Sequence, residues 1–279
     1  MNSIRRCIQS FLQIPKNLYT SIMLKTDKRV FAAFFNFKSL LFRTDTRIQW
    51  HDGFYIVTDK SMPDFRYLLR HKRRCHFAYP RGVKKRSEYL ADSYSFEEIG
   101  FEDGDVFVDC GANYGDVKIW FDVKSIDIEY IGFEPSPIEF GCLKENVRPG
   151  VVHNVGLWNT EGELKFYLSS DGADSSLIEP AHYDEVITTK VTRLDSYITS
   201  EIKCLKLEAE GAEPEILEGI GQKLDLIEYI AADLGYERGV EEESTLAPVT
   251  NFLLARNFEL INVNHVRICA LYRNKKFMT

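Results

Sequence analysis

The stretch Val106-Phe-Val-Asp-Cys-Gly-Ala-Asn-Tyr-Gly115 decides the fold. Its first five residues form a short, nearly all-apolar run, which is typical of a strand buried on both faces of a parallel sheet. Gly111 and Gly115 follow and open a helical pattern. Glycine lets the backbone approach a ligand closely, and the first turn of a helix offers unpaired N–H groups. The stretch therefore predicts a strand, a ligand-binding turn and a helix.

The same alternation continues to the C-terminus. Further apolar runs lie at 130–133, 151–155, 204–207, 227–232, 258–263 and 266–272, and helical patterns lie at 115–121, 138–147, 213–219 and 244–256. Strands that alternate with helices predict a doubly wound, Rossmann-like α/β sheet with helices on both faces. The turn at Asn264-His265 makes the last strand antiparallel. Residues 160–198 interrupt the alternation and predict an inserted β segment with a loop.

The charges divide the chain into two parts. Residues 1–90 hold 19 Lys or Arg and 6 Asp or Glu, a net charge of +13, whereas the remaining residues carry −20. We therefore expect a basic, substrate-facing N-terminal extension over residues 1–99 and a ligand-binding α/β domain over 100–279. The acidic part is a poor candidate for binding nucleic acid.

Within the extension, residues 1–45 show helical spacing of apolar side chains. Residues 48–58 predict a β-hairpin with Asp52-Gly53 at its turn. Residues 64–90 predict a basic helix and loop. Their basic patch consists of Arg70, Arg73, Arg74, Lys84, Lys85 and Arg86. Such a patch suits a phosphorylated or carboxylated glycan, an anionic membrane surface, or solvent alone.

The sequence favours a cytoplasmic location. No apolar run reaches the ~18 residues that a spanning helix needs, and the apolar start of the chain is too interrupted for a signal peptide. Peripheral contact with the inner membrane face through the N-terminal region stays an open alternative to a helical lid. The six cysteines form no CxxC pair and no His cluster accompanies them. This pattern indicates reduced, packed thiols and no metal site.

A second motif, Ile131-Gly-Phe-Glu-Pro-Ser-Pro137, places Glu134 at the end of the next strand, 23 residues after Gly111. An acid about 20 residues after the glycine turn is the usual partner of ribose hydroxyls in this topology. The glycine spacing separates two kinds of cofactor. A dinucleotide fingerprint is G-x-G-x-x-G, whereas here four positions separate Gly111 from Gly115. An amino-acid-tailed nucleoside such as S-adenosylmethionine therefore fits better than a pyrophosphate.

A third motif, Leu205-Lys-Leu-Glu-Ala-Glu-Gly-Ala-Glu-Pro-Glu-Ile-Leu217, follows the fourth strand. It places Glu208 and Glu210 at the carboxyl end of a strand, where open α/β sheets bind ligands. Glu213 begins the next helix beside Pro214, which suits a first-turn position. Three acids within six residues repel one another unless something positive lies near them, and the sulfonium or amino group of a ligand or a metal ion could supply that charge.

Taken in order with Ser175-Ser176-Leu177 and the TRLDSYI stretch at 192–198, these motifs resemble FkbM-type methyltransferases over about residues 100–275. The resemblance implies a class I S-adenosylmethionine-dependent O-methyltransferase fold and cofactor. Many such enzymes modify polysaccharides, glycolipids or secondary products. The implied cofactor site consists of Asp109, Gly111, Asn113, Tyr114, Gly115, Glu134, Pro135, Ser136, Ser176 and Glu208. The family usually has Asp and Val at the positions of Glu208 and Ala209, and the added methylene moves the carboxylate by about 1.5 Å.

We therefore predict methyl transfer to a hydroxyl of a sugar, glycan or glycolipid acceptor. Removing the hydroxyl proton calls for a general base. The candidates are Glu208, Glu210, Asp233 and His182. Two other readings stay open: a nicotinamide-dependent oxidoreductase, and a non-catalytic scaffold with the same fold. The sequence names neither the acceptor nor an oligomeric state.

Overall fold

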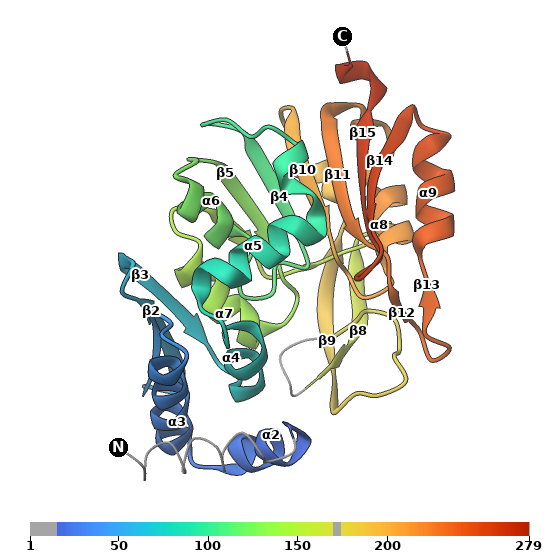
Figure 1. Ribbon diagram of the computed structural model, residues 1–279. Helices are drawn as coiled ribbons and strands as arrows, with labels where there is room; N and C mark the ends of the chain where they lie inside the picture. Colours follow the sequence, from blue (N-terminus) through green and yellow to red (C-terminus); the bar gives the residue numbers. More distant parts are fainter. Residues whose placement is uncertain (1–15, 170–173, 279) are drawn as a thin grey trace.

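The computed structural model describes residues 16–169 and 174–278. Its centre is a seven-stranded sheet in the order β14-β15-β11-β10-β4-β5-β6 (Figure 1). The strands are β4 (Val106–Cys110), β5 (Glu129–Phe133), β6 (Val151–His153), β10 (Ile202–Leu207), β11 (Ile227–Asp233), β14 (Phe258–Asn264) and β15 (Cys269–Asn274). Only β15 runs against its neighbours in this sheet. The predicted doubly wound sheet with an antiparallel last strand is confirmed.

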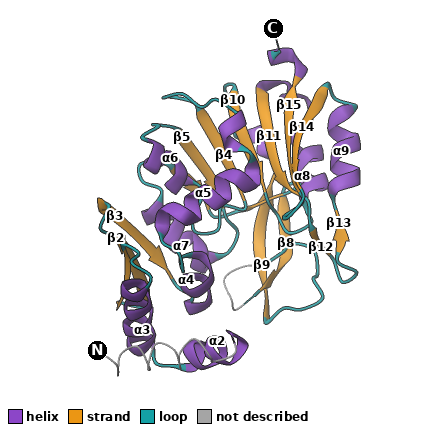
Figure 2. Cartoon of the chain, in the orientation of Figure 1, coloured by secondary structure: helices purple, strands orange, loops and turns teal. Residues whose placement is uncertain are grey.

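Helices pack on both faces of the sheet (Figure 2). They are α5 (Val83–Tyr94), α6 (Lys118–Lys124), α7 (Pro137–Asn146), α8 (Glu213–Ile220) and α9 (Leu246–Leu254). Side chains of α5, α6 and α7 bury one face with Phe107 and Cys204, whereas α8 and α9 bury the other with Val108 and Leu205. Successive side chains of one strand thus point to opposite faces of the sheet. Because helices cover both faces, the core strands are apolar throughout.

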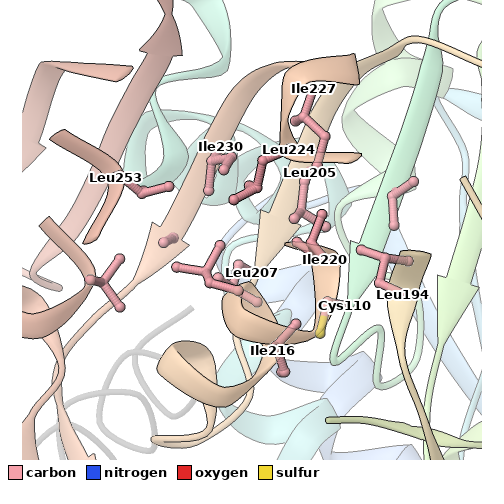
Figure 3. Close-up of a cluster of buried hydrophobic side chains, with 14 of the residues drawn as sticks. Cys110, Leu194, Leu205, Leu207, Ile216, Ile220, Leu224, Ile227, Ile230 and Leu253 are labelled. Atoms are coloured by element: carbon pink, nitrogen blue, oxygen red, sulfur yellow. The ribbon is translucent and has the colours of Figure 1, made fainter. Parts of the chain in front are cut away.

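The face under α8 and α9 holds a continuous apolar cluster (Figure 3). Leu205 and Leu207 of β10 are fully buried, and at most 1% of Ile216 and Ile220 of α8 is exposed. Burying a Leu or Ile side chain stabilises a fold by about 1.5–3 kcal/mol. This packing holds the carboxyl end of β10 rigidly beside that of β4.

The N-terminal part forms a separate layer below the sheet in Figure 1. It comprises α2 (Lys16–Lys25), α3 (Lys28–Leu41), the antiparallel strands β1 (Thr46–His51), β2 (Phe54–Asp59) and β3 (Met62–Leu69), and α4 (Lys72–Ala78). The predicted hairpin is confirmed, with Asp52 and Gly53 both at positive φ as a tight turn requires.

One expectation for this layer is wrong. The stretch 64–90 is predicted as a basic helix and loop, yet its first residues, 64–69, belong to β3, which pairs with β2. Pro63, Asp64 and Arg66 obscure the two-residue period that only Tyr67 and Leu69 show by their burial. Pairing with β2 decides the conformation here, since strand propensity depends on tertiary context.

The N-terminal layer is joined to the sheet domain by specific contacts. Asn146 of α7 accepts the N–H of Leu68 at 2.7 Å and donates to the carbonyl oxygens of Leu68 and Tyr114 at 3.0 and 2.9 Å. Helix α5, which precedes residue 100, packs directly on the sheet. The segment 83–99 is therefore structurally part of the sheet domain's core.

The predicted insertion is a small sheet of β7 (Gly156–Leu157), β9 (Glu185–Thr192) and β8 (Gly162–Leu168). A two-stranded ribbon of β12 (Tyr236–Arg238) and β13 (Glu243–Ser244) follows β11. Short 3₁₀ turns lie at Phe96–Glu98, Leu194–Ser196, Gly221–Leu226 and Lys275–Phe277.

The cysteines match their predicted state wherever the structure describes them. Cys75, Cys110, Cys142, Cys204 and Cys269 are buried free thiols, and Cys7 lies outside the described residues. Across residues 16–169 and 174–278 there is no helix both long and apolar enough to cross a membrane.

Candidate active site

A cavity of about 320 Å³ opens at the carboxyl ends of the central strands. This volume lies in the range of small-molecule sites, and the strand ends are where α/β sheets bind ligands. Eight of the predicted site residues line it: Asp109, Gly111, Asn113, Glu134, Pro135, Ser136, Glu208 and Glu210. Sequence motifs that lie 100 residues apart therefore meet in one cavity.

Gly111 sits at the closest approach between two of these motifs. It adopts φ +69°, and a Cβ there would lie 1.7 Å from the carbonyl oxygen of Glu208. No side chain fits that space. The turn after β4 and the loop after β10 therefore lie backbone against backbone, which brings Asp109 and Glu208 to the same cavity wall.

Glu134 directly follows β5 and is a buried carboxylate that forms no ion pair with any residue the structure describes. Its two oxygens accept backbone N–H groups of Asn113 at 2.7 Å and Ser136 at 2.8 Å. Burial, with the nearby charge of Glu139, raises its pKa to about 8. Each oxygen keeps a free lone pair, so the group is suited to accept the two hydroxyls of a ribose.

Asp109 belongs to a chain of alternating charges that crosses the cavity floor. Lys206 Nζ lies 3.0 Å from Asp109 Oδ1 and 2.9 Å from Glu208 Oε2. Arg267 lies 2.7 Å from the other oxygen of Glu208 and also pairs with Asp233. Although burial opposes ionisation, Lys206 and Arg267 hold the pKa of Glu208 well below its ordinary value. Glu208 is therefore a permanent charge and a weak base.

Glu210 and Glu237 are in the opposite situation. Both line the cavity, and neither carboxyl group has an ion pair or hydrogen bond to any other residue that the structure describes. Burial and the charges of neighbouring acids raise the pKa of both, that of Glu237 to about 8. Gly211 allows their segments to meet, because a Cβ there would lie 2.6 Å from Arg238 Cα. The pair supplies a carboxylate that holds or gives up a proton near neutral pH.

Five predicted site residues do not line the cavity. Tyr114 is buried and donates to Glu139 at 3.1 Å. Gly115 faces Val147 of the adjoining segment. Ser176 is buried and donates to the carbonyl of Glu210 at 2.9 Å, so it supports the loop. Asp233 is buried and pairs with Arg267. His182 is exposed and lies outside the cavity.

Several residues that line the cavity are not predicted from the sequence. Lys206 interrupts an otherwise apolar run, and Arg267 lies in the apolar run at 266–272, so neither is predicted as a site residue. Glu237 lies beyond the third motif. The local signal for Lys206 was its position inside a buried strand, since a lysine there needs a counter-charge. Nothing local marks Arg267 or Glu237, because the antiparallel strand and the ribbon bring them to the site.

The residues fit an S-adenosyl ligand. The glycine turn admits close backbone contact, a buried acid ends the second strand, and the carboxyls of Glu210 and Glu237 would attract the positively charged sulfur of such a ligand. The described residues contain no group of three or more His, Cys, Asp or Glu side chains that are placed to hold a metal ion. The sheet order and this site define the Rossmann-like class of S-adenosylmethionine-dependent methyltransferases.

Residues 109–260, more than half of the chain, match the family model described as the methyltransferase FkbM domain, and the chain belongs to this family. Among curated proteins there is no match.

Three of the solved structures with a similar fold are described as follows. A SAM-dependent methyltransferase from Aquifex aeolicus is 12% identical, with TM-score 0.38, covering 68% of this chain and 95% of its own. Precorrin-6y C5,15-methyltransferase from Geobacter metallireducens GS-15 is 14% identical, with TM-score 0.38 and coverages of 70% and 90%. A Streptococcus pneumoniae protein in complex with S-adenosyl-L-methionine is 11% identical, with TM-score 0.39 and coverages of 68% and 72%.

Proposed function

We propose that this methyltransferase transfers the methyl group to a hydroxyl oxygen of a sugar, glycan or glycolipid. The observation that carries the proposal is the pair Glu210 and Glu237, two cavity carboxyls without counter-charge. A sugar hydroxyl holds its proton firmly, so its methylation profits from a base in contact with it. A base is most effective when its pKa lies near the working pH.

The chain's own residues divide the work. When bound, S-adenosylmethionine supplies a methyl group whose bond to sulfur breaks as the bond to the acceptor oxygen forms, with the electron pair staying on sulfur. Glu237, with Glu210 beside it, takes the hydroxyl proton. The permanent charges of Glu208, Lys206 and Arg267 fix the floor of the cavity, and positioning of this kind contributes much of the rate in such transfers.

The test measures transfer of labelled methyl from S-adenosylmethionine to a panel of glycosides and polysaccharides. An ether product resists alkali, whereas a methyl ester is hydrolysed, so alkali treatment identifies the acceptor atom. Glu237→Gln should lower kcat about 100- to 1000-fold, as loss of a general base does, and should leave binding of S-adenosylhomocysteine intact. The matched control is the exposed Glu241→Gln. Alkali-labile product, or full activity of Glu237→Gln, would refute the proposal.

A further inference from the structure

The buried carboxylate of Asp116 is shared by two arginines, Arg74 of α4 in the N-terminal layer and Arg86 of α5 on the sheet. Arg74 Nη2 lies 3.0 Å from Asp116 Oδ2, and Arg86 donates to the same oxygen from Nη2 at 2.9 Å and from Nε at 3.2 Å. The other oxygen, Oδ1, accepts the hydroxyls of Tyr67 and Tyr79, each at 2.7 Å. Asp116 therefore has no acceptor capacity left for a further cation.

The cluster carries an excess positive charge. Two guanidinium groups face one carboxylate, and the Nε of Arg74 is buried without a hydrogen-bond partner. Although burial opposes ionisation, Arg74 and Arg86 hold the pKa of Asp116 well below its ordinary value. Asp116 is thus ionised, and the cluster keeps a net charge of about +1.

This excess charge faces the cavity. Arg74 and Arg86 line it together with Asp116 and Tyr89, and their side chains are 21% and 13% exposed. Other members of the basic patch point elsewhere, as their partners show. Arg70 binds the carbonyl of Gly53, Arg73 lies over the ring of Phe77, and Lys85 pairs with Glu88. The structure thus selects two residues of the patch for the site.

We infer that Arg74 and Arg86 bind an oxyanion of the acceptor, so that the acceptor is an acidic sugar with a carboxylate or phosphate group beside the hydroxyl. The inference rests on the proposed function. A guanidinium presents its N–H groups as a planar fork that matches carboxylate and phosphate oxygens. Tyr89 lines the same wall, and the Arg86 guanidinium lies over its ring, 5.9 Å from the centroid. The family model matches residues from 109 onward, a range that contains the glycine turn and Glu134 but neither arginine. The two arginines are therefore a feature of this chain outside the matched domain.

The competing occupant is the carboxylate of the cofactor itself, and two ligands separate the cases. S-adenosylhomocysteine carries that carboxylate, whereas 5′-methylthioadenosine lacks the whole amino-acid tail. We expect Arg74→Gln and Arg86→Gln to bind both ligands within about twofold of the parent chain. Loss of S-adenosylhomocysteine binding with methylthioadenosine binding retained would assign the arginines to the cofactor and overturn the inference.

The acceptor side is tested with matched neutral and acidic sugars, methyl glucoside against methyl glucuronide and glucose 6-phosphate. We expect the parent chain to favour an acidic sugar by KM, and each variant to lose about 10- to 100-fold of that preference, as removal of a charged hydrogen bond does. Arg73→Gln on α4 and Lys84→Gln on α5 are the matched controls, since neither lines the cavity. An unchanged preference would contradict the inference.

A binding measurement keeps this test independent of methyl transfer. Titration with inorganic phosphate and with glucuronate should show saturable binding to the parent chain, weakened in Arg86→Gln. If the sugars are not methylated but the anions bind in this way, the proposed reaction fails while the anion site stands. If methyl transfer occurs and neither anion binds, the anion site fails alone. A circular dichroism spectrum verifies that each variant is folded.

A second surface carries an independent inference. Helix α3 presents a large apolar face to solvent, opposite the side on which Phe31 and Phe35 are buried. Its exposed residues are Val30, Phe34, Phe37, Leu40, Leu41 and Phe42. Phe37 is 51% exposed. Residues 16–43 hold six Lys or Arg and one Asp or Glu. An apolar helix face with basic flanks is the pattern of a segment that lies in a membrane interface.

We propose that this face binds an anionic membrane surface. The full chain should sediment with vesicles that contain phosphatidylglycerol and not with pure phosphatidylcholine, and salt should weaken binding, since each basic residue adds about fivefold in partitioning. Phe34→Ser with Phe37→Ser should abolish sedimentation, whereas Val266→Ser, at an 88% exposed side chain elsewhere, should not. The proposal is overturned if the parent chain does not sediment with the anionic vesicles. It is also overturned if light scattering shows a dimer that only the double variant loses, because the apolar face then binds a second copy of this chain.

Discussion

Glu134 makes the affinity for the nucleoside depend on pH. Its pKa is raised to about 8 by burial and by Glu139, and it must be ionised to accept two ribose hydroxyls, since a protonated carboxyl loses part of its acceptor capacity. At pH 7 about one-tenth of the molecules hold it ionised, and at pH 9 about nine-tenths. The apparent affinity for a ribose-bearing ligand should therefore rise about tenfold between these pH values, or about 1.4 kcal/mol.

The assay is calorimetric titration with 5′-methylthioadenosine, which has the ribose but no ionisable amino-acid tail. At pH 7 binding should release about 0.9 proton, because the ligand selects the ionised form. The released protons are counted by repeating the titration in buffers of different ionisation enthalpy.

Other groups near the site are separated by variants. Glu237 also has a pKa of about 8, so Glu237→Gln should keep the pH dependence if Glu134 is its source. Glu134→Gln should lose both the affinity and the pH dependence. Affinity that is flat from pH 7 to 9, or that falls as pH rises, would refute the assignment of the ribose to Glu134.

Three further predictions concern the framework of the cavity. Gly111→Ala should weaken S-adenosylhomocysteine binding more than about tenfold by calorimetry, because the added Cβ would lie 1.7 Å from a backbone oxygen. Gly141→Ala on α7 has open space around it, so it should leave binding unchanged and change the free energy of unfolding by zero to about 1 kcal/mol in the stabilising direction. Equal binding by both variants would contradict this prediction. Lys206→Met should lower the free energy of unfolding by about 3–5 kcal/mol in urea, because it leaves the buried Asp109 without its cation and takes one of two cations from Glu208. A loss below about 1 kcal/mol would show that the pairing is not needed. Asp116→Asn should cost a similar amount near pH 7. Because the pKa of Asp116 is lowered in the folded protein, its contribution is present above the ordinary pKa and is lost as pH falls below it, so the difference between parent and variant should shrink in acid.

The sequence sufficed for the sheet and for the cofactor half of the site. Short apolar runs with glycine turns are local signals, and the strand ends of a parallel sheet converge by geometry alone. Asp109, Gly111 and Glu134 therefore came together as expected. The first helix of the domain was placed too early, at Gly115 instead of Lys118, because Asn113 and Gly115 take positive φ before the helix begins.

The acceptor half of the site could not be predicted, because its residues are brought together by tertiary structure. Arg267 reaches Glu208 only because β15 inserts between β11 and β14. Glu237 reaches Glu210 through a ribbon that has no strong strand pattern. The charge of Glu208 was expected to meet a ligand cation, yet two side chains of the protein neutralise it. A sequence shows the excess of acids but not which of them are paired.

The charge asymmetry of the chain takes on a structural meaning at Asp116. The basic first 90 residues and the acidic remainder of the chain meet where Arg74 of α4 and Arg86 of α5 share the carboxylate of Asp116. Had each arginine its own acid, the contact would be neutral and would serve attachment alone. Because one acid serves both, the same contact fixes the N-terminal layer and leaves a positive charge on the cavity wall. The five hydrogen bonds to Asp116 thus join Tyr67, Arg74 and Tyr79 to the sheet domain and, in the proposed anion site, also hold both arginines at the cavity wall.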